Sequence, residues 1–126
     1  MLFRSPAYLD ALARCRRLAR DEGLKAVLEQ QRLDALVAPT GNPPWTIDLV
    51  NGDHFLGGSS TPAAVAGFPH ITVPAGYVFG LPVGVSFVGA PFSEPTLVKL
   101  AYAYEQATKR RRSPTFLPTV DVGAGR

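Results

Sequence analysis

The sequence predicts an α/β fold with a long N-terminal helix, about three core strands of a mixed sheet and a C-terminal helix. Three observations support this prediction. Residues 6–31 space their apolar side chains with a helical period, two β-branched runs surround Ile71 and Val85, and a capped amphipathic stretch begins at Ser93. A further short strand near Ala35 makes helices and strands alternate along the chain.

Residues 6–31 are expected to form the first helix, with Ser5 as its N-cap and Pro6 in its first turn. Gly23 can interrupt this stretch, so we expect either one bent helix or two. Cys15 lies on the apolar stripe and is interpreted as a packing residue, because no neighbour in the sequence would activate its thiol. The arginine-rich start is superficially similar to a mitochondrial transit peptide, but Asp10 and the low serine content favour a mature helix.

The next element is a short apolar strand, residues 35–38, which Pro39 ends. A helix, a tight turn and a strand in this order suggest half of a βαβ layer. Ligands of open α/β sheets gather beyond the carboxyl ends of the strands, so Pro39, Thr40 and the loop after them are expected on the functional side.

The loop from Gly41 to Gly58 is longer than most connections in compact domains and carries two aromatic residues, Trp45 and Phe55. Two interpretations remain open. The loop caps a pocket, with Trp45 or Phe55 against a substrate side chain, or it is an Ω-loop packed on itself. Asp53 and His54 are assigned a surface hydrogen-bonding role, because neighbours in sequence do not make a catalytic pair.

Residues 59–89 are expected to hold a short helix and two buried strands. Thr61 is the expected N-cap, and Gly67 the left-handed stop. A strand over residues 71–73 should end at Pro74, and a second should span residues 83–88, with a glycine-containing turn between them. Both runs are too apolar for a strand with one wet face, so helices should cover the sheet. His70 is interpreted as structural.

The last helix is expected to begin at Ser93 and to bury an inner face of four residues: Leu97, Leu100, Ala101 and Tyr104. The cluster of cations at residues 109–112 suits the negative end of the helix dipole. From Ser113 the chain is broken by prolines, Phe116 and Leu117 can dock on the body, and residues 119–126 are expected to form a flexible tail.

Composition narrows the function further. The 126 residues suffice for one domain, with 46% apolar and 18% charged residues. A net charge of +3 without a localised basic face argues against nucleic acid as a partner. The single cysteine excludes an internal disulfide and indicates a reducing compartment, the cytoplasm. No apolar run approaches about 18 residues, so no membrane span is expected. No pattern suggests a metal or another cofactor.

Several separated blocks closely resemble the C-terminal part of amidase signature enzymes. They are D-A-L-V-A-P-T at residues 34–40, P-A-x-x-A-G-x-P-x-x-x-x-P-x-G at 62–76, G-L-P-V-G-x-x-x-x-G at 80–89 and L-V-K-L-A-Y-A-Y-E at 97–105. The resemblance covers roughly Leu33 to Pro118 and implies that residues 1–118 are a C-terminal segment of the α/β/α amidase fold. It also implies hydrolysis of carboxamide C–N bonds through a serine acyl-enzyme in the complete protein.

The resemblance implies a Ser-cisSer-Lys triad in an N-terminal half that this chain does not contain. The glycine- and serine-rich stretch at Ser59 and Ser60 mimics the family's nucleophile signature, but Thr61 and Pro62 follow it where glycine and serine would be expected. We therefore expect no catalytic residue in the chain and no activity from it alone. The substrate-pocket candidates are Pro39, Thr40, Trp45 and Phe55, which would form part of a wall for a small-molecule amide substrate.

Alternatives to this interpretation stay open. The A subunits of tRNA-dependent amidotransferases tend to carry N-L-A-G where this chain has A-V-A-G at residues 64–67, which favours a general amidase. A stand-alone, non-catalytic subunit or binding module could instead dimerise through its sheet edge. A gene remnant without function is the third possibility. The expected partner is accordingly either the missing N-terminal portion or a second copy of the chain.

Overall fold

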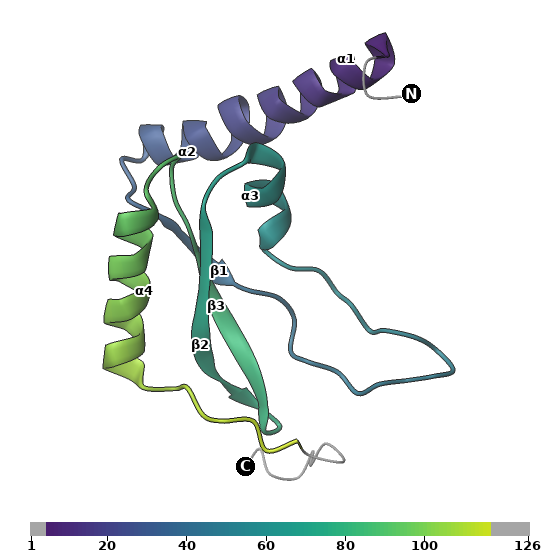
Figure 1. The fold of residues 1–126 in the computed structure, drawn as a ribbon, viewed down its shortest axis with the longest axis vertical. Coiled ribbons are helices and arrows are strands. Elements are labelled where there is room, and N and C mark those ends of the chain that lie inside the picture. The colour runs from purple at the N-terminus through teal and green to yellow at the C-terminus, as the bar shows by residue number, and fades with distance from the viewer. Residues whose placement is uncertain (1–4, 117–126) are drawn as a thin grey trace.

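The computed structural model describes residues 5–116 as a three-stranded sheet with helices on one face and at one end (Figure 1). The elements follow in the order α1 (Pro6–Cys15), η2 (Arg16–Leu24), α2 (Lys25–Gln30), β1 (Leu36–Pro39), α3 (Ser60–Ala66), β2 (His70–Val78), β3 (Leu81–Val88) and α4 (Glu94–Thr108). The predicted α/β class, with three strands and a helix at each end, is confirmed. The tail predicted at residues 119–126 lies outside the described residues, as do Leu117 and Pro118.

The N-terminal helix is bent at Gly23, as its sequence allows. α1 runs into η2, a stretch of wider π-type turns, and the backbone of Gly23 leaves helical geometry at φ −97° and ψ −109°. Ser5 caps α1 by accepting a hydrogen bond from the backbone N–H of Tyr8 at 3.3 Å. The packing role expected of Cys15 is wrong: its side chain is exposed, because α1 projects beyond the sheet and buries none of its residues (Figure 1).

The sheet has the order β1-β3-β2, and both strand pairs are antiparallel. A βαβ layer, half of which was expected from the first helix and strand, needs a parallel strand pair. The described strands contain no parallel pair. β2 and β3 make a hairpin whose two turn residues, Phe79 and Gly80, have φ of 51° and 76°, as a type I′ turn requires. Pro74 does not end its strand as expected. It precedes a bulge in β2, and an edge strand tolerates the missing N–H.

Two clusters of buried side chains make the core. α4 covers one face of the sheet, where Leu97 and Ala101 pack against Val73 and Phe87. Leu100 and Tyr104 pack against the same cluster, so the predicted inner face of α4 is confirmed. The second cluster joins α2 and α3 to the end of β3 through Leu28, Ala63, Ala66, Phe68 and Val88. On the opposite face, Val88 is thus covered by α2 and α3, and Thr72 and Ser86 lie further along the same strands.

The helix boundaries follow local signals with one exception. Gly67 ends α3 with a left-handed φ of 72°, as predicted. α3 begins earlier than expected, however, with Ser59 and not Thr61 at the N-cap. Ser93 is the N-cap residue of α4 as predicted, but its hydroxyl donates to the carbonyl of Ala90 at 2.7 Å and makes no cap hydrogen bond.

Within residues 5–116, no helix combines the length and the apolar character that crossing a membrane would require.

Candidate functional site

Three hydroxyl groups form a row across the sheet on the face opposite α4. The Ser86 Oγ lies 2.8 Å from the Thr40 Oγ1 and 2.9 Å from the Thr72 Oγ1. Ser86 is at 0% exposure, Thr40 is half-buried and Thr72 is exposed. We call these three residues the hydroxyl row. A polar side chain this deeply buried is stabilised only when it is hydrogen-bonded, and Ser86 has a partner on each side.

Strand register brings the hydroxyl row together. Thr72 is the direct partner of Ser86 in the β2–β3 ladder, and the bulge after Pro74 shifts the register so that they meet. Thr40 follows the end of β1, where its N–H donates to the carbonyl of Gly84 at 2.9 Å. A Cβ at Gly84 would lie 2.6 Å from the Thr40 Oγ1 and 2.9 Å from the Thr72 Cγ2, so glycine makes room for both threonines.

The hydroxyl row can bind a polar group, but among residues 5–116 no basic side chain is hydrogen-bonded to it. Three hydroxyls carry three hydrogens and share two hydrogen bonds, so one O–H can donate to another acceptor. Activation of a hydroxyl as a nucleophile needs an adjacent base. The three lysines of the chain lie elsewhere, Lys25 on α2, Lys99 on α4 and Lys109 at the end of α4.

Residues 41–58 form a projecting arm that is closed at its base (Figure 1). Gly41 and Gly58 make an antiparallel bridge, and the N–H of Ser59 donates to the carbonyl of Thr40 at 3.1 Å. Further out, the rings of Trp45 and Phe55 lie 6.1 Å apart. The arm therefore packs on itself, which is one of the two interpretations of the sequence.

Asp53 has the surface hydrogen-bonding role predicted for it, because its Oδ1 accepts from the Trp45 Nε1 at 3.3 Å. At the tip, the carboxylate of Asp48 accepts from the side chain of Asn51 and from the N–H groups of Asn51 and Val50, all at 2.9 Å. These hydrogen bonds, from Asn51 first, hold the pKa of Asp48 below its ordinary value. The arm is thus tied at the base, in the middle and at the tip.

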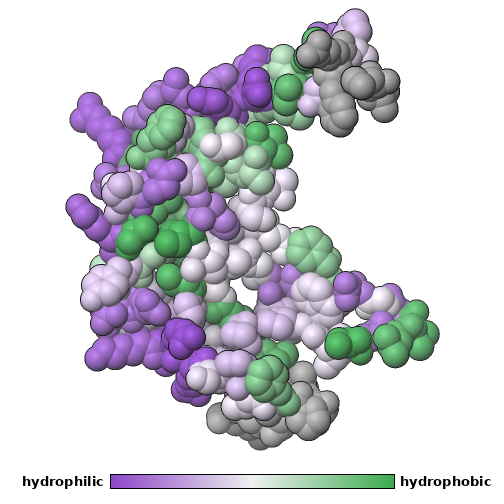
Figure 2. Space-filling model, in the orientation of Figure 1, coloured by the Kyte–Doolittle hydropathy of each residue, from purple (hydrophilic) through white to green (hydrophobic). Residues whose placement is uncertain are grey.

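Apolar side chains are nevertheless exposed on the arm. Ile47, Leu49 and Val50 are 89%, 95% and 92% exposed, and we call them the apolar tip. Figure 2 shows apolar surface at the end of the arm and a hollow between the arm and the N-terminal helices. Exposed apolar side chains in such a group mark a surface that contacts something else.

The structure does not bring the four predicted pocket residues together into one pocket. Pro39 lines a shallow apolar groove beside Val85 and Tyr104, and Thr40 belongs to the hydroxyl row. Trp45 lines a hollow of the arm itself, and the Phe55 ring packs against the Trp45 ring. Sequence reasoning missed Thr72 and Ser86. The available signal was that Thr72 is the one polar residue of the run 71–73 and Ser86 the one polar residue of the run 83–88.

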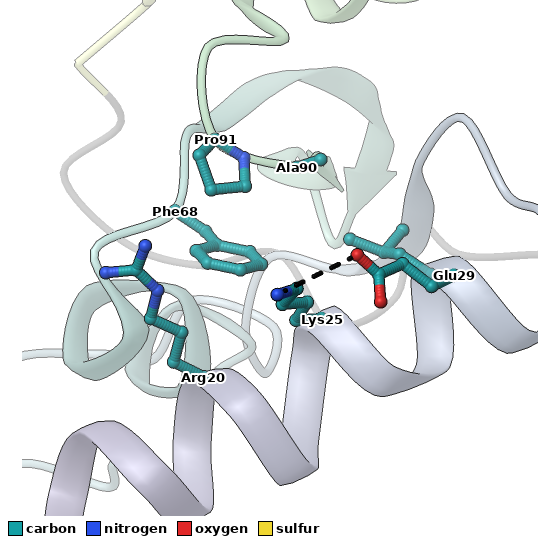
Figure 3. Close-up of a pocket in the computed structure, with 7 residues that line it drawn as sticks. Arg20, Lys25, Glu29, Phe68, Ala90 and Pro91 are labelled. Carbon is teal, nitrogen blue, oxygen red and sulfur yellow. Dashed lines mark ion pairs between the residues drawn. The ribbon is translucent and has the colours of Figure 1, made fainter.

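A further pocket lies between α2, Phe68 and the loop after β3 (Figure 3). Its lining residues are Arg20, Lys25, Leu28, Glu29, Phe68, Ala90 and Pro91. The Lys25 Nζ faces the Glu29 Oε1 at 4.0 Å, so one of the two cations is partly neutralised. Three separate segments build this pocket, and no local pattern of residues indicates it.

Other polar groups of the described chain show no reactive arrangement. Within residues 5–116, no three His, Cys, Asp or Glu side chains gather closely enough to hold a metal ion. The buried Nε2 of His70 has no hydrogen-bond partner among the described residues.

Comparisons with known proteins place these features in context. Residues 3–98 match the Amidase family model. A probable amidase from Arabidopsis thaliana is 38% identical over 109 residues, covering 85% of this chain and 18% of the relative. The A subunit of glutamyl-tRNA(Gln) amidotransferase from Desulforudis audaxviator is 38% identical over 112 residues, covering 83% and 22%. Overall identity therefore does not separate the two kinds of relative.

Among solved structures, native peptide amidase from Stenotrophomonas maltophilia is 51% identical to the chain with a TM-score of 0.80. The match covers 89% of this chain and 22% of that enzyme. The chain thus spans about a fifth of the length of the relatives it matches.

Proposed function

The chain belongs to the amidase family, and on this basis we propose that it is the C-terminal portion of an enzyme that hydrolyses carboxamide bonds. Its contribution is to complete the sheet and to supply part of the substrate pocket. The catalytic serines and lysine come from the preceding part of the enzyme. This division of roles is supported by the hydroxyl row, which has hydrogen-bonding capacity but no base hydrogen-bonded to it among the described residues.

Exposed apolar surface on the helices and on the arm is the observation that carries the proposal. Large apolar side chains are exposed both on the N-terminal helices, at Leu9 and Leu18, and at the apolar tip of the arm. Relatives about five times longer than the chain have the additional polypeptide that would cover such a surface. We propose that the preceding part of the protein fills the hollow between the arm and the N-terminal helices (Figure 2).

Peptide amides are the proposed substrate class. The support is the 51% identity with a protein described as a peptide amidase, over 89% of this chain. The pocket wall would include Pro39 and Thr40 at the end of β1 and the aromatic pair of Trp45 and Phe55 on the arm. Aromatic rings suit a substrate side chain or peptide plane, since recognition pockets are mostly apolar with a few polar groups.

The test compares the isolated chain with the full-length protein, using ammonia release from a C-terminally amidated peptide. We expect activity only from the full-length protein. Ser59→Ala and Ser60→Ala should each change its rate by less than about tenfold, because neither serine is assigned a nucleophilic role. A fall on the order of 10⁶-fold for either variant, the scale expected on removing a nucleophile, would refute the assignment.

A stand-alone module remains the second candidate, and the sheet edges favour it. β1 and β2 are the outer strands, and neither has a further strand partner within residues 5–116. Such edges can pair with a second copy. Intact mass of the natural product separates the candidates: a protein far heavier than 13.5 kDa supports the enzyme, and a stable oligomer of a 13.5 kDa chain supports the module.

A further inference from the structure

The arm has two limbs, the segments of the chain that lead to the tip and back from it. The side chain of Asn42 joins these two limbs. Its Oδ1 accepts a hydrogen bond from the N–H of Leu56 at 3.3 Å. Its Nδ2 donates to the carbonyl of His54 at 3.4 Å and to that of Pro43 at 3.0 Å. One carboxamide thus satisfies two backbone groups of the opposite limb and one of its own.

The sequence around Asn42 explains why a side chain is needed here. Pro43 and Pro44 follow Asn42 directly, and neither has an N–H to donate to a neighbouring strand. Among the described residues, the limbs pair through their backbones only at the base, where Gly41 bridges Gly58. Beyond that bridge, the Asn42 carboxamide supplies the donor and the acceptor that a backbone ladder would otherwise provide.

Asn42 thereby holds the aromatic pair in place. Phe55 lies between His54 and Leu56, so both of its backbone neighbours are bonded to Asn42. Trp45 follows the two prolines and meets the Phe55 ring at a centroid distance of 6.1 Å with a 56° tilt. Release of Leu56 and His54 would free the backbone of Phe55 and remove one support of the Trp45 ring.

We propose that Asn42 is a positioning residue. Its carboxamide fixes the position of the Trp45 and Phe55 rings relative to a peptide amide substrate. This inference rests on the proposed function, in which these two rings form part of the pocket wall. Asn42 itself does not touch the substrate. Preorganisation of the arm lowers the entropy lost on binding, so it should act on KM and leave the chemical step unchanged.

The test uses the full-length protein and an amidated peptide with an aromatic C-terminal residue. Asn42→Ala should raise KM on the order of tenfold, the effect of one or two hydrogen bonds of ordinary strength, with kcat within about twofold. Asn42→Asp keeps the acceptor for Leu56 and loses both donors, so its KM should lie between those of the wild type and Asn42→Ala. Asn51→Ala is the matched control, because the Asn51 side chain bonds only within the tip turn and should leave KM unchanged.

A second readout does not depend on activity. Hydrogen exchange of the Leu56 N–H should be at least about tenfold faster in Asn42→Ala and unchanged in Asn51→Ala. Unchanged exchange in Asn42→Ala would show that the Asn42 side chain does not hold the two limbs of the arm together, and would overturn the proposal. Unchanged KM in Asn42→Ala, where Trp45→Ala and Phe55→Ala raise KM, overturns the positioning role. Unchanged KM in all three variants instead overturns the pocket wall of the proposed function, and with it the substrate role of the arm.

Discussion

Replacing Ser86 by alanine measures what the hydroxyl row contributes to the sheet. The substitution removes two hydrogen bonds, of 2.8 and 2.9 Å, from a side chain at 0% exposure. At about 0.5–1.5 kcal/mol for each bond, the full loss is about 1–3 kcal/mol. Thr72 is exposed and can bind water instead, whereas Thr40 is half-buried and recovers less. We therefore expect Ser86→Ala to lower the free energy of unfolding by about 1–2 kcal/mol.

The assay is urea unfolding of the full-length protein, in which the midpoint should fall with the slope unchanged. Ser93→Ala serves as the control, because it removes one exposed hydrogen bond and should cost less than Ser86→Ala. A double-mutant cycle with Thr40→Val should give a coupling of about 0.5–1.5 kcal/mol, since the two side chains are in direct contact. Additive effects of the two substitutions, or a Ser86→Ala protein as stable as the wild type, would refute the reasoning.

Three further predictions concern single positions. Gly84→Ala places a Cβ 2.6 Å from the Thr40 Oγ1, so it should destabilise the protein by about 1–3 kcal/mol in urea unfolding; a neutral result would mean that the strands shift freely. Leu97→Ala removes a side chain of α4 that is only 2% exposed. Thermal unfolding should show that the free energy of unfolding falls by about 2–5 kcal/mol, against less than about 0.5 kcal/mol for Val98→Ala, whose side chain is exposed. The lowered pKa of Asp48 means that its contribution to the tip turn is complete above the ordinary aspartate pKa and is lost as the pH falls through the lowered value. The Asn51 amide resonance should therefore titrate with a midpoint below that of an unstructured aspartate, and Asp48→Asn should abolish the transition.

The helices were largely predictable because their signals are local. Ser5, Gly67 and the inner face of α4 from Leu97 to Tyr104 act through residues a few positions away. Cys15 shows the limit of the same reasoning. Periodicity places it on an apolar stripe, but burial depends on what lies against that stripe, and no described element packs over α1 there.

The sheet and the candidate site were less predictable because they depend on register. A two-residue turn at Phe79 and Gly80 alone would pair Thr72 with Phe87, and the bulge after Pro74 moves Thr72 opposite Ser86. Nothing in a single sequence fixes a bulge of one residue. β1 also pairs with β3 across more than forty intervening residues, so the position of Thr40 beside Ser86 could not be inferred from neighbouring positions.

The exposed apolar tip of the arm is better explained as a contact surface than as part of a loosely folded loop. A flexible loop would lower its free energy by folding Ile47, Leu49 and Val50 back onto the body, since burying one such side chain is worth about 1.5–3 kcal/mol. The hydrogen bonds of Asn42 at the base and of Asp48 at the tip oppose that collapse and hold these side chains outward. The structure thus preserves an apolar surface that water disfavours, which is typical of a contact surface. In a chain that spans about a fifth of its relatives, the preceding part of the enzyme covers that surface under the proposed function.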